Sequence, residues 1–212
     1  EQLDEYAALI GYHFEQAGQF LPAARYNARA AKWVAPSDSR RAMSAWRKVR
    51  ELLERTAPSA EVDSLMVLAY AKAAWLSWRE GTSMNEVMPF IHEARRIAGT
   101  GDARIMRLLL FLEGRMHQAS GGSVDRYAAF VREALATMQP DEGLGSKVLL
   151  NIGLCQALAW AGMFREALQA SDDALTGIDA VDRFEEDFIG YSLKHWLLML
   201  RGRVLVRLGR LD

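Results

Sequence analysis

The residues of this 212-residue chain best suited to metal ligation or nucleophilic catalysis are four histidines and one cysteine. His13, His92, His117 and His195 form no His-Glu-x-x-His pair or other tight ligand spacing, which would place two ligands on one helix face. Cys155 is alone, so it can form neither an internal disulfide nor a cysteine metal cluster, and we interpret it as a buried packing residue rather than a reactive thiol. Phosphate-binding glycine loops and a Gly-x-Ser-x-Gly elbow are absent too. We therefore expect no catalytic residue, no metal and no cofactor in this region.

The composition favours a folded protein, and the single cysteine favours a reducing cytoplasm. Half of the residues are hydrophobic, a quarter are charged and the formal net charge is −1, which argues against a broad nucleic-acid-binding surface. No apolar run approaches the ~20 residues that span a bilayer, and no signal peptide is visible, so we expect no membrane contact.

One basic segment, from Arg40 to Arg50, deserves a separate interpretation. It carries Arg41, Arg47 and Lys48 on an amphipathic helix that also carries Trp46. Nucleic-acid or membrane contact is conceivable for such a helix. We favour a solvated outer face, because a helix with one charged face is the norm in folded proteins.

Apolar residues recur at spacings of three and four almost throughout, which predicts an all-α fold. Clusters of Gly, Pro and Ser interrupt this pattern and divide the chain into ten expected helices. Their ranges are 3–17, 20–35, 39–56, 61–80, 84–98, 103–119, 124–138, 144–161, 164–177 and 184–208. Ser83 with Glu86 predicts a capping box, and Ser39 and Ser123 are further candidate N-caps. Pro89 makes the start of the fifth helix hard to place.

A short phrase occurs twice. The run from Ala17 to Ala24 and the run from Ala161 to Leu168 share the pattern Ala-Gly-x-Phe-x-x-Ala. Glycine ends one helix, the aromatic residue packs under the turn, and the small alanine allows the next helix to pack back closely. Turn glycines at Gly18, Gly81, Gly122, Gly162 and Gly209 extend this helix–turn–helix organisation along the chain, and that is typical of tetratricopeptide repeats.

We expect one divergent solenoid over 1–212, with hairpin units at about 3–35, 61–98, 103–138 and 144–177, an unpaired helix at 39–56 and an incomplete unit at 184–212. Both ends look cut, which suggests a fragment of a larger multidomain protein.

Longer stretches resemble a particular tetratricopeptide region. They are Leu3-Asp4-Glu5 to Tyr12-His13-Phe14-Glu15-Gln16-Ala17-Gly18, then Ala23-Ala24-Arg25-Tyr26 to Trp33, Ala45-Trp46-Arg47-Lys48-Val49 and Trp196-Leu197-Leu198-Met199-Leu200-Arg201-Gly202. The combination is similar to the C-terminal helical region of bacterial signalling proteins that join a class III adenylate/guanylate cyclase domain to a P-loop ATPase. Related regions follow the ATPase in maltose-regulator-like transcription activators. The cyclase metal-binding aspartates and the nucleotide-binding loop have no counterpart in this chain.

The resemblance implies a right-handed superhelix of about ten helices whose first hairpin helices line a concave groove. The inward positions of that register are the candidate partner-binding residues Tyr12, Glu15, Trp75, Trp78, Arg79, Met116, Gln156, Trp160, Trp196, Arg203 and Arg207. Tryptophan and arginine supply much of the energy at binding hot spots, although any single one of these residues could equally belong to the core. The expected function is non-catalytic regulation by a protein, a peptide segment, an upstream domain or a small effector in the groove. The alternatives are the effector-sensing arm of a transcription activator, a generic repeat scaffold and, with the least support, an all-α enzyme.

Overall fold

The structure is a computed structural model that describes residues 2–99, 103–139, 143–181 and 183–210; of Gln2, Trp78 and Arg183 it describes the backbone alone. Every regular element in these residues is a helix, so the predicted all-α class is confirmed. The α-helices are α1 (Gln2–Glu5), α2 (Ala7–Gln16), α3 (Phe20–Val34), α4 (Ser39–Leu53), α5 (Ala60–Ser77), α6 (Met84–Ala98), α7 (Ala103–Ala119), α8 (Val124–Ala136), α9 (Leu144–Trp160), α10 (Phe164–Leu175), α11 (Arg183–Ile189) and α12 (Leu193–Arg207). Two short 3₁₀ helices, η1 (Trp78–Glu80) and η2 (Ile178–Ala180), follow α5 and α10.

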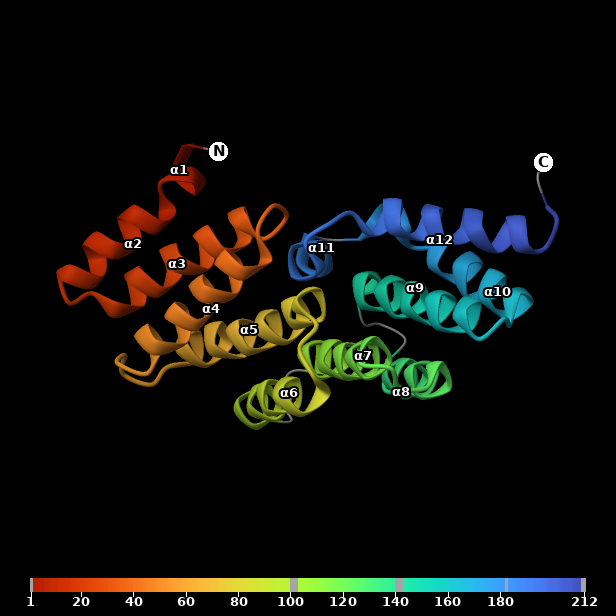
Figure 1. Ribbon diagram of the computed structural model, residues 1–212, viewed down its shortest axis with the longest axis horizontal. Coiled ribbons are helices and arrows are strands. Elements are labelled where there is room, and N and C mark those ends of the chain that lie inside the picture. Colours follow the sequence, from red (N-terminus) through yellow and green to blue (C-terminus); the bar gives the residue numbers. More distant parts are fainter. Residues whose placement is uncertain (1, 100–102, 140–142, 182, 211–212) are drawn as a thin grey trace. The chain divides into compact units, whose positions relative to one another are not determined.

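The chain divides into two compact units, unit 1 over residues 1–102 and unit 2 over residues 103–212. In unit 1 each of the helices α2 to α5 packs against the next one along the chain, and the series ends at α6 (Figure 1, red to yellow). The core of unit 1 gathers the buried face of α4, which includes Trp46, Val49 and Leu53, and Val87 and Ile91 of α6. The predicted unpaired helix at 39–56 corresponds to α4, which packs against both α3 and α5.

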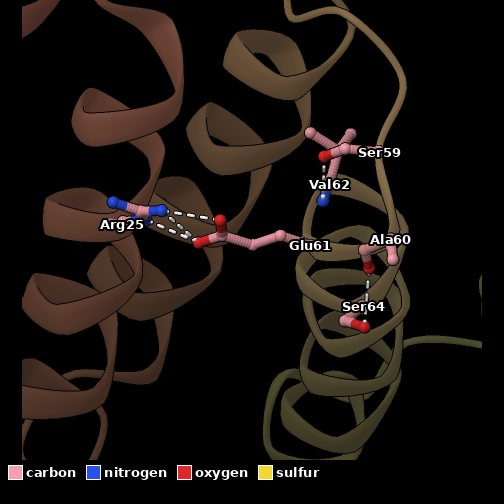
Figure 2. Close-up of polar contacts among 6 residues, drawn as sticks. All are labelled: Arg25, Ser59, Ala60, Glu61, Val62 and Ser64. Atoms are coloured by element: carbon pink, nitrogen blue, oxygen red, sulfur yellow. Dashed lines mark hydrogen bonds and ion pairs between the residues drawn. The ribbon is translucent and has the colours of Figure 1, made fainter.

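Polar side chains on the surface of unit 1 connect helices that are far apart in the sequence. The Arg25 guanidinium of α3 donates two hydrogen bonds of 2.6 Å to the Glu61 carboxylate of α5. Figure 2 shows this pair beside the local bonds at the start of α5, where Ser59 Oγ accepts from the Val62 amide at 3.2 Å. The pair therefore ties α5 to α3 across the helix that separates them in the chain.

In unit 2 the central element is α9, which packs against α7, α8, α10 and α12 (Figure 1, green to blue). Its residues are apolar almost all round, and both Leu149 and Ile152 are fully buried. A helix that is apolar on every side belongs inside a packed unit. The other helices of unit 2 are thus organised around α9.

The turns between paired helices repeat one geometry. Positive φ angles of 68 to 87° occur at Gly18, Gly81, Gly121, Gly162 and Gly209. After each glycine, the next amide donates to the carbonyl five residues back, as from Gln19 to Phe14 at 2.9 Å and from Met163 to Leu158 at 2.9 Å. This is the Schellman helix end, and it requires a left-handed residue that glycine adopts without strain.

The predicted turn glycine of the third hairpin is wrong by one position. Gly121, not Gly122, has the positive φ angle of 87°. Gly122 is instead constrained by space, because a Cβ there would lie 2.2 Å from His117 Nδ1. Gly121 therefore provides the left-handed backbone conformation of the turn, and Gly122 provides the space for the close approach of His117.

A small residue stands seven positions before every turn glycine: Gly11, Ala74, Gly114, Cys155 and Gly202. At Gly11 an added Cβ would lie 2.7 Å from Asn27 Nδ2 of α3, and at Gly114 it would lie 2.8 Å from Phe130 Cβ of α8. Cys155 is fully buried at the same position. The spacing therefore marks the point where the second helix of a hairpin comes closest to the first.

Most helix boundaries follow the sequence prediction, with three corrections. The first expected helix is interrupted at Tyr6, between α1 and α2. The last expected helix is two helices, because Gly190, with φ 90°, ends α11 before Ser192 caps α12. The N-cap of α4 is Asp38 rather than Ser39, and its carboxylate accepts from the Arg41 amide at 2.9 Å.

The other capping predictions are confirmed. Ser83 and Glu86 form the capping box of α6, and Ser123 Oγ accepts from the Asp125 amide at 3.1 Å. Pro89 is the sixth residue of α6 and is exposed, so the helix continues through the position that made its start hard to place. The expected connections at 99–101 and 140–145 lie partly outside the described residues.

Candidate functional site: a pocket in unit 1

A pocket of about 640 Å³ opens among the first four helices of unit 1. This size lies within the range of about 300–1,000 Å³ that is usual for ligand sites. The pocket is lined by residues of α1, the start of α2, the C-terminal half of α3, the connection after α3, and α4. They are Asp4, Glu5, Ala8, Asn27, Ala30, Trp33, Val34, Ser37, Arg41, Ser44, Ala45 and Lys48. We call this cavity the unit-1 pocket.

Helix packing explains why the unit-1 pocket forms at this place. α3 packs against both α2 and α4, so the C-terminal half of α3 supplies Asn27, Ala30 and Trp33 between the starts of the two flanking helices. The end of α2 is tied to α4, because Glu15 accepts from Lys48 Nζ at 2.7 Å and lies 3.7 Å from Arg55 Nη1. No described ion pair links the start of α2 to α4 in this way, and the pocket opens there.

Charged groups on the pocket wall fall into two kinds. Asp4 and Lys48 are engaged, since Asp4 accepts a hydrogen bond from Arg29 and Lys48 donates to Glu15. The hydrogen bond from Arg29 is the largest influence on Asp4, and it lowers the pKa of that carboxyl group. Glu5 and the Arg41 guanidinium are exposed and form no ion pair within the described part of the chain. One free negative group and one free positive group are therefore available to a ligand.

Trp33 provides an aromatic wall. Its side chain is half exposed near the end of α3. The opposite face of α3 is packed through buried alanines such as Ala28 and Ala31. A large exposed aromatic ring beside free charges is a common composition for a recognition surface. The unit-1 pocket can therefore contact both apolar and charged parts of one ligand.

The eleven residues predicted to line a groove are divided between unit 1 and unit 2. None of them lines the unit-1 pocket. Glu15 affects the pocket indirectly, because it accepts a hydrogen bond from Lys48, which lines the unit-1 pocket. Arg79 is exposed in unit 1 and donates from Nη1 to the Ala35 carbonyl at 3.1 Å, which satisfies the end of α3.

Four of the eleven are core residues in this structure. Trp75, Met116, Gln156 and Trp196 are between 0 and 7% exposed. Met116 and Trp196 pack inside unit 2, and Gln156 Oε1 lies 3.5 Å from the Tyr127 hydroxyl that donates to it. Their expected place on a partner-facing surface is therefore not what the structure shows.

Four others remain on the surface. Tyr12 and Trp160 are 54% and 43% exposed, and Arg203 and Arg207 of α12 are exposed as well. The Arg115 guanidinium lies 5.2 Å from the centre of the Trp160 ring, a cation–π contact on unit 2. The side chain of Trp78 lies outside the described residues.

The pocket residues Trp33 and Arg41 were not among the groove predictions. Arg41 belongs to the basic segment interpreted as a solvated outer face, and the structure divides that segment. Arg47 is exposed, Arg41 and Lys48 line the pocket, and the Arg50 guanidinium lies 4.8 Å from the Tyr70 ring centre. Trp33 could have indicated the site from the sequence, because it is a large aromatic residue on the side of its helix opposite the buried alanines.

Neither metal nor membrane features are present in the described residues. They contain no group of three or more His, Cys, Asp or Glu side chains arranged to hold a metal ion. In the same residues no helix is long and apolar enough to cross a bilayer.

Comparisons with protein-family models, curated proteins and solved structures found no match to this chain.

Proposed function

We propose that this chain is a regulatory, partner-binding region of a bacterial cytoplasmic signalling protein of the adenylate/guanylate cyclase type. In this proposal the region has no catalytic site of its own, and its fold is a tetratricopeptide-like superhelix. An effector, a peptide segment or another domain of the same protein occupies the unit-1 pocket. Occupancy shifts the balance between inactive and active states of the catalytic modules.

The observation that carries the proposal is the recurrence of one hairpin device. A small residue and a left-handed glycine seven positions later recur five times, and four of these turns show both Schellman hydrogen bonds. Tandem helical hairpins of this kind serve mainly as binding scaffolds. The resemblance of the stretches from Leu3 to Gly18 and from Ala23 to Trp33 to ATPase-linked cyclases supplies the signalling context.

The pocket supplies the means of regulation. A ligand shifts an equilibrium only by its differential affinity for two states. The unit-1 pocket draws its walls from α1, α2, α3 and α4, so a change in the angles between these helices changes the distances among Glu5, Trp33 and Arg41. Two states of the hairpin would then differ in affinity for the same ligand.

The test is a cyclic-nucleotide measurement on the full-length protein, expressed in a bacterium that lacks its own cyclases. Trp33→Ala and Arg41→Gln in the pocket are compared with Arg132→Gln, a matched control because Arg132 is exposed on α8 and forms no described ion pair. We expect the pocket variants to shift the cellular cyclic-nucleotide level several-fold and the control to match wild type. Equal levels in all four proteins, at equal protein abundance, would contradict the proposal.

A further inference from the structure

The two side walls of the unit-1 pocket carry opposite charges. Asp4 and Glu5 of α1 line one wall, and Arg41 and Lys48 of α4 line the other. Between these walls α3 forms the floor, because it packs against α1 and α2 as well as against α4 (Figure 1). A ligand that lies across the pocket therefore meets negative groups at one end and positive groups at the other.

One charged group on each wall remains available to such a ligand. Asp4 and Lys48 already form ion pairs within unit 1. Glu5 and the Arg41 guanidinium form none within the described part of the chain. A purely anionic ligand would bring its charge toward Glu5, and a purely cationic ligand would bring its charge toward Arg41. A ligand with one ammonium and one carboxylate group pairs with both residues, so the two walls favour a ligand of that kind.

The floor and the α4 wall add contacts for the middle of the ligand. Asn27 Nδ2 donates to the Ala23 carbonyl at 2.9 Å, which leaves Asn27 Oδ1 as an acceptor that receives no described hydrogen bond. The Ser44 hydroxyl lies one turn after Arg41 on the same wall and also has no described partner. The half-exposed ring of Trp33 supplies an apolar surface. These groups suit a ligand with an amide N–H and an apolar side chain between its charged ends.

We propose that the unit-1 pocket binds a zwitterion of the amino-acid class, namely a free amino acid or a short peptide with both termini free. Its ammonium group pairs with Glu5, and its carboxylate pairs with Arg41 and accepts a hydrogen bond from the Ser44 hydroxyl. Its side chain packs on Trp33. The inference rests on the proposed function, because it names the chemical class of the effector that the pocket holds.

The test begins with calorimetric binding to the purified full-length protein. The probes are the standard free amino acids and the tripeptides Ala-X-Ala, in which X is each standard amino acid in turn. Each probe that binds is compared with its N-acetylated and C-amidated forms. We expect each cap to weaken binding about tenfold, because it removes one charge-assisted hydrogen bond. Binding by the free amino acids alone, or by the tripeptides alone, distinguishes the two sources of the zwitterion.

Two variants assign each end of the ligand to a wall. With Glu5→Gln the free and N-acetylated probes should bind equally, while C-amidation still weakens binding. With Arg41→Gln the dependence should be reversed. Both side chains are exposed, so circular dichroism should show unchanged helix content. Arg132→Gln is the matched control and should preserve the effect of both caps, because Arg132 is exposed on α8 and forms no described ion pair.

Three results would overturn the inference: no binding by any free probe, equal binding of free and capped probes to wild type, or binding of inorganic phosphate or a simple amine in their place. The cyclic-nucleotide measurement separates this inference from the proposed function. Pocket variants that shift the cyclic-nucleotide level while no zwitterion binds would leave regulation in place and refute the ligand class. Zwitterion binding with unchanged cyclic-nucleotide levels would support the ligand class and contradict the regulatory role.

Discussion

Glu185 is fully buried in unit 2, and the Arg104 guanidinium donates to both of its carboxylate oxygens, at 2.8 and 2.6 Å. Ser146 Oγ donates a third hydrogen bond to the same carboxylate at 2.9 Å. The three residues lie on α11, α7 and α9, so one carboxylate joins three helices of unit 2. Gly145 makes room for it, because a Cβ there would lie 2.3 Å from Glu185 Oε2.

Breaking this pair from its two ends should have unequal effects. Arg104→Gln leaves a buried carboxylate with its main partner gone, and we expect a loss of about 3–5 kcal/mol in the free energy of unfolding. Glu185→Gln should cost less, because the Arg104 side chain is one-third exposed and can reach water. Urea unfolding of both variants checks the order. Equal losses, or a larger loss for Glu185→Gln, would mean that the Glu185 carboxylate is not buried and dependent on Arg104 in solution.

Two glycines at equivalent helix positions should respond oppositely to alanine. At Gly114 an added methyl group would lie 2.8 Å from Phe130 Cβ and 3.0 Å from the Tyr127 ring, and we expect Gly114→Ala to destabilise the chain by about 1–3 kcal/mol. At Gly202 the space is open, so Gly202→Ala should stabilise it by about 0.5–1 kcal/mol. Thermal unfolding at low protein concentration measures both in the monomer. A stabilising Gly114→Ala would contradict the close approach of α7 and α8.

The Cys155 thiol should be unreactive in the folded protein. Burial raises its pKa from 9.0 to about 11, because the thiolate loses its hydration. Little thiolate therefore exists at pH 8, and alkylation by iodoacetamide should be slow until the chain is unfolded in urea. Rapid native-state alkylation at pH 8, followed by mass spectrometry, would show that the thiol is accessible after all.

The same shift predicts a stability change in alkali. A group whose folded pKa is raised contributes fully below its unfolded pKa and loses that contribution as the pH rises through the folded value. The Cys155 contribution should thus be constant below about pH 9 and decline between pH 9 and about 11. Cys155→Ala is the control, and its stability should fall less steeply over this range than that of wild type.

Unit 1 should weaken in acid. Hydrogen bonds from Arg25 lower the pKa of Glu61, and hydrogen bonds from Ser39 and then Arg40 lower the pKa of Glu80. A lowered folded pKa gives stability that is present above the unfolded value, near 4.5, and is lost as the pH falls through the folded value. We expect small losses, because the pairs are partly exposed. Arg25→Gln should flatten the pH dependence of urea unfolding below pH 4.5, and an unchanged slope would mean that the Glu61 pair does not form in solution.

The helices could be predicted closely because their end signals are local. The expected spans 84–98 and 103–119 match α6 and α7 residue for residue. The capping box at Ser83 and Gly99, whose φ is 58°, lie directly at the two ends of α6. The split at Gly190 was missed because the apolar periodicity continues on both sides of it.

The candidate site could not be predicted in the same way. The groove prediction selected helix positions that point away from the second helix of the same hairpin. It assumed that such positions face solvent. Helices α5 and α9 are apolar almost all round, so Trp75 and Gln156 are buried by other neighbours. The unit-1 pocket depends on the spacing of α2 and α4 over α3, which no single segment encodes.

The most direct test of the regulatory proposal is to sequence the gene on both sides of the codons for residues 1 and 212. We expect a P-loop ATPase domain upstream, preceded by a class III cyclase domain. A DNA-binding helix-turn-helix domain in place of the cyclase would contradict it and assign the region to a transcription activator. A gene with neither a cyclase nor an ATPase domain would also contradict it.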